Sequence, residues 1–355
     1  MMIEMNSLDE KVETLEQLIE KELKPYVKKI DAEGFYQEQY LRELGKAGFF
    51  STNHKSQKEY ILQEMKVVEE TAKWCMTTAF CLWCHLAALT YVRNSNNLSL
   101  KNKLLPLLES GKILGATGLS NPMKYYAGLE KLHLKAKPKE DGYILSGVLP
   151  NVSNLGDNHW FGVIAEVDEH KRIMCFIPSN AEGLILKEKN DFLGLNGSAT
   201  YSCTFQDVFV PNEWVLSDDA DLFVEKIRPV FILYQIPLGL GVIRSSIASI
   251  EKVINKQNGC NSFLKIQPGQ LKTQERKIQD DIHALFSDQR LDWKEIAKIR
   301  LEAAYLTLEA VQANMLHHGS AGYLMHSAPS RRLREAYFFA NLTPTVKHLE
   351  KVLHS

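Results

Sequence analysis

Apolar residues recur at three- and four-residue steps along the first part of the chain. Leu8, Val12, Leu15 and Ile19 follow this spacing, which places them on one face of a helix. Ser7 and Glu10 have the spacing of a capping box in front of that stripe. The pattern predicts an N-terminal helical domain over residues 1–115.

The pattern changes to alternation between about residues 116 and 220. Leu132, Leu134 and Ala136 alternate with polar residues, and turn residues such as Asp141–Gly142 and Asn196–Gly197 divide the stretch into short segments. No helical spacing separates these segments. The middle domain, residues 116–220, is therefore expected to be an antiparallel β-barrel or sandwich and not a parallel dinucleotide-binding fold.

Helical spacing returns in the last third, residues 221–355. Pro229–Val253 is largely apolar and Trp293–Leu316 is a long amphipathic stretch, which together indicate a C-terminal four-helix bundle. Thr343–Pro344 has the composition of an N-cap followed by proline at the first helical position. The fold class expected for the whole chain is a multidomain α+β protein in the order helices, β domain, helices.

Composition excludes several classes of protein. The 355 residues include 42 Lys plus Arg and 43 Asp plus Glu, a net charge of -1, so no global field attracts the chain to nucleic acid. The N-terminus has the features of neither a secretory signal nor a transit peptide, which makes the cytoplasm the expected compartment. The apolar stretches Phe80–Val92 and Pro229–Ile243 are shorter than the roughly 20 residues that cross a bilayer, so no membrane span is expected. The six cysteines are expected to be reduced, buried thiols.

Two motifs resemble cofactor sites but have simpler explanations. Cys81, Cys84 and His85 have the letters of a c-type haem attachment site, yet they lie in an apolar helical stretch where core packing explains them better. Gly239 and Gly241 resemble part of a dinucleotide fingerprint, although close helix packing is the better interpretation.

Two clusters of basic residues are further candidates for binding sites. His317 and His318 diverge by about 100° on a helix and would not share a metal ion, and no metal site is expected. Arg331 and Arg334 lie on neighbouring helix positions. They would bind an anion, pair with a carboxylate of a partner subunit, or form an ordinary salt-bridged helix face.

Several segments match, in sequence order, the motifs of one flavoprotein family. Leu119–Pro122 stands where that family has L-T-E-P, and Asn151–Asn154 stands where it has W-I-T-N. Phe205–Pro211 fits F-x-D-V-x-V-P, and Arg334–Ala336 fits R-D-A. In these segments and in its order of domains, the chain resembles the acyl-CoA dehydrogenase family.

The resemblance implies FAD held between the β domain and the C-terminal bundle, usually across a contact between subunits of a homodimer or homotetramer. An acyl thioester, presented by coenzyme A or a carrier protein, would lose an α proton to a carboxylate and a β hydride to the flavin. An electron-transfer partner or a reductase is implied as well. The positions that correspond to cofactor-binding ones are Leu119, Ser120, Asn151, Val152, Ser153, Gly319, Ser320 and Thr345.

The chain departs from the family at the catalytic base. Thr343 stands where the family carries its glutamate, and a threonine hydroxyl is not a base near neutral pH. Glu225, near the start of the C-terminal bundle, is the candidate substitute. Tyr234, Gln235 and Leu238 would line the pocket only if their apolar helix faces the cofactor.

The resemblance and these departures together leave three candidate functions. The first is α,β-dehydrogenation of an acyl thioester. The second is a flavin monooxygenase that uses reduced flavin from a separate reductase and needs no carboxylate at Thr343. The third is a non-catalytic member that keeps the scaffold.

Overall fold

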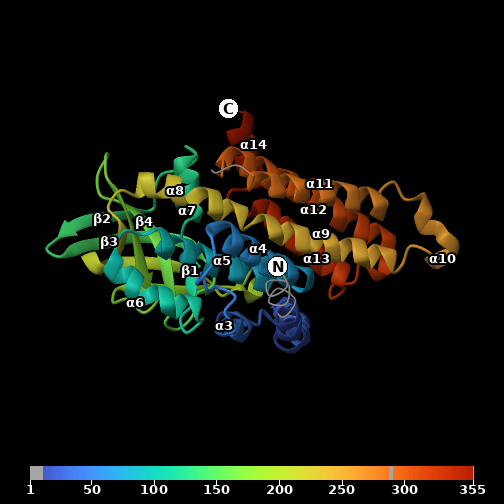
Figure 1. The fold of residues 1–355 in the computed structure, drawn as a ribbon, viewed down its shortest axis with the longest axis horizontal. Coiled ribbons are helices and arrows are strands. Elements are labelled where there is room, and N and C mark those ends of the chain that lie inside the picture. The colour runs from blue at the N-terminus through green and yellow to red at the C-terminus, as the bar shows by residue number, and fades with distance from the viewer. Residues whose placement is uncertain (1–10, 288–290, 355) are drawn as a thin grey trace.

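The computed structural model describes residues 11–287 and 291–354. The sheet forms one end of the molecule and the C-terminal helices extend to the other, with α4 and α5 between them (Figure 1). The predicted order of helices, β domain and helices is confirmed. The expected capping box at Ser7 and Glu10 lies outside the described residues.

The N-terminal region consists of helices that surround one fully buried helix. All residues of α5 from Met76 to Val92 are buried, because apolar side chains cover its whole circumference. Helix α4 begins with a capping box, in which Ser56 and Glu59 each accept the other's backbone N–H. The elements of this region are an α-helix over residues 11–18, η1 (Ile19–Leu23), η2 (Lys24–Tyr26), α2 (Val27–Glu33), α3 (Glu38–Lys46), α4 (Gln57–Trp74), α5 (Met76–Asn94) and α6 (Leu98–Glu109).

The middle region is an eight-stranded sheet in the order β6-β7-β3-β2-β4-β5-β8, with β1 beside β4. Most neighbours are antiparallel, as expected, but β1 and β2 each pair with β4 in parallel, so the sheet is mixed. Inward-facing residues of several strands form a separate apolar core. The elements are β1 (Gly115–Thr117), α7 (Ser120–Tyr126), β2 (Leu134–Lys139), β3 (Gly142–Val152), β4 (Trp160–Glu166), β5 (Arg172–Pro178), β6 (Leu184–Lys189), η3 (Asn196–Ser198), β7 (Thr200–Pro211), η4 (Asn212–Trp214) and β8 (Val215–Ser217).

The C-terminal region is a bundle in which α9 and α12 are the central helices. Gly239 allows close packing, because a Cβ atom there would lie 2.5 Å from Cε1 of Phe339, which confirms the packing interpretation of this glycine. The elements are α8 (Ala220–Leu233), α9 (Ile236–Glu251), α10 (Lys256–Gly259), η5 (Cys260–Phe263), α11 (Pro268–Leu285), α12 (Trp293–His318), η6 (Gly319–Ala321), α13 (Ala328–Asn341) and α14 (Val346–His354).

The apolar stretch that runs through α8 and α9 is longer than the sequence pattern suggested. Ala220–Glu251 has the length and composition of a membrane-crossing helix, but 89% of its most apolar window is buried inside the protein. Burial of this kind is typical of a core helix.

Several smaller expectations are corrected by the structure. Five cysteines are buried and unbridged, but Cys260 is exposed. His317 is buried and its Nε2 lies 2.9 Å from the carbonyl of Ile266. The residue that caps α14 is Thr345, whose Oγ1 accepts the N–H of His348, whereas Pro344 precedes the helix.

Candidate active site

A cavity of about 200 Å³ lies where α5, the sheet and the C-terminal bundle meet. We call it the central cavity. Its apolar walls come from the buried helix α5, the end of α8, the loop after β6 and α13. The aromatic side chains of these walls are Phe80, Trp83, Phe192, Phe231 and Phe338.

Hydroxyl groups form the polar part of the central cavity. They belong to Thr117, Ser120, Ser153, Ser198, Thr200 and Thr343.

Three of these hydroxyls form a chain. Thr200 Oγ1 lies 2.7 Å from Ser153 Oγ and 2.8 Å from Ser198 Oγ. The chain fixes the side of the cavity that the sheet supplies.

The opposite side of the cavity comes from the link between α13 and α14. Thr343, in this link, has its Oγ1 3.1 Å from Oγ of Ser120 at the start of α7. The lining also includes the amides of Asn151 and Asn341 but, among residues 11–287 and 291–354, no Asp, Glu, Lys, Arg or His side chain. Burial raises the pKa of the Cys84 thiol well above its usual range, so this lining group stays protonated and uncharged.

The structure brings together four of the sequence-predicted site residues. Ser120, Asn151, Ser153 and Thr343 all line the central cavity. Their roles toward a cofactor stay predictions.

Two further predicted positions, Leu119 and Val152, are fully buried beside this set and would offer only backbone groups to a ligand. Thr345 follows two residues after Thr343 and caps α14.

Three other predicted residues lie elsewhere. Glu225 is exposed on α8 and is absent from the lining of the central cavity, because it lies on the solvent side of an amphipathic helix. The geometry therefore gives Glu225 no access to a substrate in this cavity. Gly319 and Ser320 lie in η6 at the far end of α12, so they would approach a cofactor only in a neighbouring subunit.

Other candidates from the sequence also have structural partners. Arg334 donates to both carboxylate oxygens of Asp31 at 2.6 Å, and Arg331 pairs with Glu335 at 3.0 Å. The salt-bridged face is thus the correct interpretation of this arginine cluster. Gln235 does not line the cavity but donates from Nε2 to the carbonyl of Thr343 at 2.9 Å.

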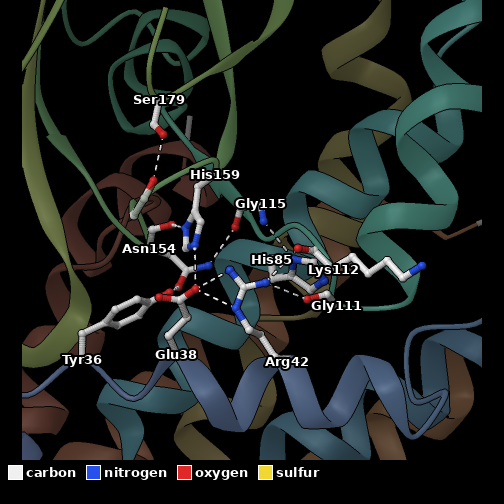
Figure 2. A network of polar contacts seen from close by, with 11 residues as sticks. Tyr36, Glu38, Arg42, His85, Gly111, Lys112, Gly115, Asn154, His159 and Ser179 are labelled. Atoms are coloured by element: carbon white, nitrogen blue, oxygen red, sulfur yellow. Dashed lines mark hydrogen bonds and ion pairs between the residues drawn. The ribbon is translucent and has the colours of Figure 1, made fainter.

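A polar network supports the segment Asn151–Asn154 from behind (Figure 2). The side chain of Asn154 accepts a hydrogen bond from the hydroxyl of Tyr36 at 2.6 Å and donates to the carbonyl of Gly115 at 2.8 Å. Its own carbonyl lies 2.9 Å from Nδ1 of His159. These contacts join the N-terminal helices to the residue next to Ser153.

Glu38, on α3, is the charged centre of this network (Figure 2). Its Oε1 lies 3.4 Å from Nε2 of His159 and accepts a hydrogen bond from Nε of Arg42 at 2.7 Å. The contact with His159, together with that of Arg42, lowers the pKa of the Glu38 carboxyl to about 2. Arg42 also donates to the carbonyls of Gly111 and Lys112, so the network holds the start of β1 in place.

Sequence reasoning missed several residues of the cavity. The apolar pattern favoured core packing for Trp83 and Cys84, although both line the cavity. Phe338 and Asn341 also line it, and their positions just before Thr343 were the available signal.

The lining of the central cavity fits the flat, uncharged ring of a flavin. Aromatic walls pack against such a ring, and the hydroxyls of Ser120 and Ser153 match its polar edge. The volume of about 200 Å³ is below the roughly 300–1,000 Å³ of a typical ligand site, so the cavity would take part of a ligand such as a ring but not a whole dinucleotide.

Gly194, in the lining, packs closely against α13. A Cβ atom there would lie 3.1 Å from Cβ of Arg334.

A helical bundle, a mixed sheet and a second bundle thus meet around a hydroxyl-lined cavity. The family model for the N-terminal domain of acyl-CoA dehydrogenases matches residues 7–112. Residues 7–112 of the chain are therefore assigned to the N-terminal domain of that family.

Curated relatives and solved structures agree with this assignment. The probable acyl-CoA dehydrogenase YngJ of Bacillus subtilis is 23% identical over 91% of this chain and 90% of its own length. Alignments with some other curated acyl-CoA dehydrogenases cover only 56% or 65% of those proteins.

Among solved structures, butyryl-CoA dehydrogenase from Megasphaera elsdenii has a TM-score of 0.87 and 19% identity, with 98% of this chain and 96% of that chain covered. The structure described as PigA with FAD and proline has a TM-score of 0.84 and 16% identity, with 98% and 96% covered. These two similarities show the fold.

Proposed function

We propose that this protein is a FAD-dependent oxidoreductase that removes two hydrogens from the α and β carbons of an acyl thioester. The observation that carries the proposal is the central cavity, whose lining includes Thr343 together with Ser120 and Ser153 from the segments that resemble flavin-binding motifs. Bound FAD would supply the acceptor for the β hydride. Support also comes from the names of the relatives and from the neighbour described with FAD.

The protein's own residues bind and orient the acyl group and exclude water. Phe231 and Phe338 would pack against the acyl chain, and the Ser120–Thr343 hydroxyl pair would contact its polar end. Among the described residues the cavity lining supplies no carboxylate, so the α proton would pass along the Ser120–Thr343 hydroxyl pair to water outside the cavity. A slow reaction is expected, because a positioned general base contributes about 10²–10⁴-fold.

A second cavity, of about 250 Å³, has Pro344 in its lining. It suits the polar arm by which coenzyme A or a carrier protein would carry the acyl group. Its lining includes Arg228, which stacks on Trp293 at 3.8 Å, and His348. Nε of Arg228 and Nδ1 of His348 are buried without a hydrogen-bond partner among the described residues. Both groups would bind the phosphate or amide groups of such an arm.

We also propose that the protein works as a cytoplasmic homo-oligomer. Exposed apolar residues gather in η5, in the last turn of α12 and in the segment after it, namely Phe263, Leu316, Tyr323, Leu324 and Met325. Gly319 and Ser320 lie in the same segment, so association there would bring both toward a neighbour's cofactor. Light scattering at several concentrations would give the dimer or tetramer mass, and a monomer at all concentrations would contradict it.

The experiment that tests the function is an anaerobic titration of the FAD-loaded protein with acyl thioesters of different chain lengths. Loss of the yellow flavin absorbance, together with formation of the enoyl thioester, is the expected result. A loaded protein that no acyl thioester reduces would contradict the proposal. Oxygen-dependent product formation with added reduced flavin would instead identify a monooxygenase, and a protein that never binds flavin would identify a scaffold.

A further inference from the structure

Helix α12 carries a fully buried arginine behind the wall of the central cavity. Arg300 has no exposed surface. Its Nε donates to Oε1 of Gln235 at 3.0 Å, and its Nη2 donates to the carbonyl of Phe339 at 2.8 Å. The guanidinium carbon lies 3.5 Å from the centre of the Phe339 ring, and Nη1 has no hydrogen-bond partner within the described part of the chain.

No carboxylate among residues 11–287 and 291–354 forms an ion pair with this guanidinium. Burial lowers the pKa of Arg300 to about 9, and no charged side chain contributes to that shift, so the group is charged at neutral pH and its charge is not neutralised. By contrast, the buried Arg93 contacts Glu64 and Glu109. An unpaired buried charge is costly, which suggests a role beyond packing.

Two contacts connect Arg300 to the segment that lines the cavity. Phe339 lies in the last turn of α13, where the carbonyls carry partial negative charge and attract a cation. Gln235, held by Arg300 on one side, donates to the carbonyl of Thr343 on the other. The arginine thus holds both ends of residues 339–343.

We propose that Arg300, acting through Gln235, positions the Thr343 wall of the central cavity and gives that wall a positive potential. The potential favours negative charge on an acyl group beside Thr343, where this chain has no carboxylate. A fixed charge acts strongly in a water-excluded site. The stabilisation of negative charge on an acyl group rests on the proposed function. The positive potential of the Thr343 wall does not depend on that function.

The potential can be measured without substrate by placing a thiol in the wall. Thr343→Cys is close to isosteric, and the rate of its alkylation by iodoacetamide reports the thiolate fraction. Peptide mass spectrometry separates this site from the six native cysteines. The rate is compared between Thr343→Cys alone and Thr343→Cys combined with Arg300→Met, at several pH values.

Removal of the arginine is expected to raise the pKa of the introduced thiol by about one unit, which slows alkylation at neutral pH about ten-fold. This is the order expected for a unit charge roughly 12 Å away, across two hydrogen bonds and the Gln235 amide between them, at an effective dielectric constant of about 20. Arg300→Lys, which keeps the charge, should preserve most of the rate. Equal rates, within two-fold, with and without Arg300 would overturn the proposal.

Gln235→Glu provides an independent variant in case Arg300→Met does not fold. It keeps the size of the side chain and places a carboxylate against the guanidinium, so it should slow alkylation in the same way. Arg244→Met is the matched control, because Arg244 is neutralised by Glu69 and Glu275, and it should leave the rate unchanged. A slower rate in all variants alike would also refute a specific role of Arg300.

The acyl-thioester titration separates this proposal from the proposed function. If the alkylation rate depends on Arg300 but the protein binds no acyl thioester, the positive potential of the Thr343 wall is supported and the proposed function is contradicted. If the alkylation rate does not depend on Arg300 but acyl thioesters reduce the protein, the proposed function is supported and the positive potential of the wall is contradicted.

Discussion

Ser120 Oγ and Thr343 Oγ1 lie 3.1 Å apart and join the start of α7 to the link between α13 and α14. The two hydroxyls thereby close the central cavity on the side where related enzymes are expected to carry their base. Each hydroxyl both donates and accepts, so the pair passes a proton but does not hold one at neutral pH. The chemistry of the site therefore depends on binding and electrostatics more than on a titrating residue.

Replacing Thr343 by a carboxylate should create the missing base. Thr343→Glu is expected to accelerate exchange of the α hydrogens of a bound acyl thioester with solvent deuterium by about 100-fold or more, because a positioned general base contributes about 10²–10⁴. Exchange is followed by mass spectrometry under anaerobic conditions. Thr343→Gln has the same size but no base, so equal exchange in both variants would contradict the interpretation.

The hydroxyl of Tyr36 should stabilise the segment Asn151–Asn154. Tyr36→Phe removes its hydrogen bond to Asn154 and is expected to lower the free energy of unfolding by about 1 kcal/mol, with weaker FAD binding. Urea unfolding and flavin titration are the measurements. Tyr26→Phe is the control, since the Tyr26 ring stacks on Phe35, and a similar loss in both variants would argue against a specific effect.

Glu38 should make the free energy of unfolding depend on pH. Its pKa is lowered from 4.5 to about 2 in the folded protein, so the unfolded state binds the proton more readily. The stabilisation is therefore complete above the unfolded pKa and is lost as the pH falls from about 4.5 to about 2.

Urea unfolding of the wild type and of Glu38→Gln across this window tests the linkage. The wild type should be more stable at pH 6, and the difference should shrink toward zero near pH 2. A difference that stays constant with pH would show that the carboxyl does not titrate as proposed.

Gly239 should be sensitive to a single added methyl group. A Cβ atom there would lie 2.5 Å from Phe339 and 2.7 Å from Oγ1 of Thr307, so Gly239→Ala is expected to destabilise the protein by about 1–3 kcal/mol. Gly269→Ala is the control, because a Cβ atom at Gly269 meets no atom within 4 Å and alanine is the better helix former. Thermal unfolding of both variants compares them, and equal stability would disprove the packing role.

The elements followed closely from local patterns in the sequence. The stripe of apolar residues predicted the helices at both ends, and alternation around Leu134 predicted strand β2. The parallel pairing of β2 with β4 was not predictable, because pairing joins segments far apart in the chain and leaves no local pattern. The cap of α14 is local, but Thr343 and Thr345 are both capping residue types, and only the path of the backbone decides that Thr345 accepts the helix N–H.

The site was predictable only in part. Ser120, Asn151, Ser153 and Thr343 were identified by motif position and do lie together. Glu225 has the chemistry of a base and a place near the bundle, but the amphipathic face of α8 turns it to solvent. Cavity walls such as Trp83 look like any other core residue in a sequence.

The sequence by itself determined the order of the three regions, the likeness to acyl-CoA dehydrogenases and the loss of a glutamate at Thr343, since these depend on residue type and spacing along the chain. Only the tertiary structure decided that no charged group lines the cavity and that Arg300 lies behind it without a carboxylate partner in the described chain. Burial and electrostatic pairing depend on distances in space, and Arg300, Gln235 and Thr343 come together only when α12 packs against α9 and the end of α13.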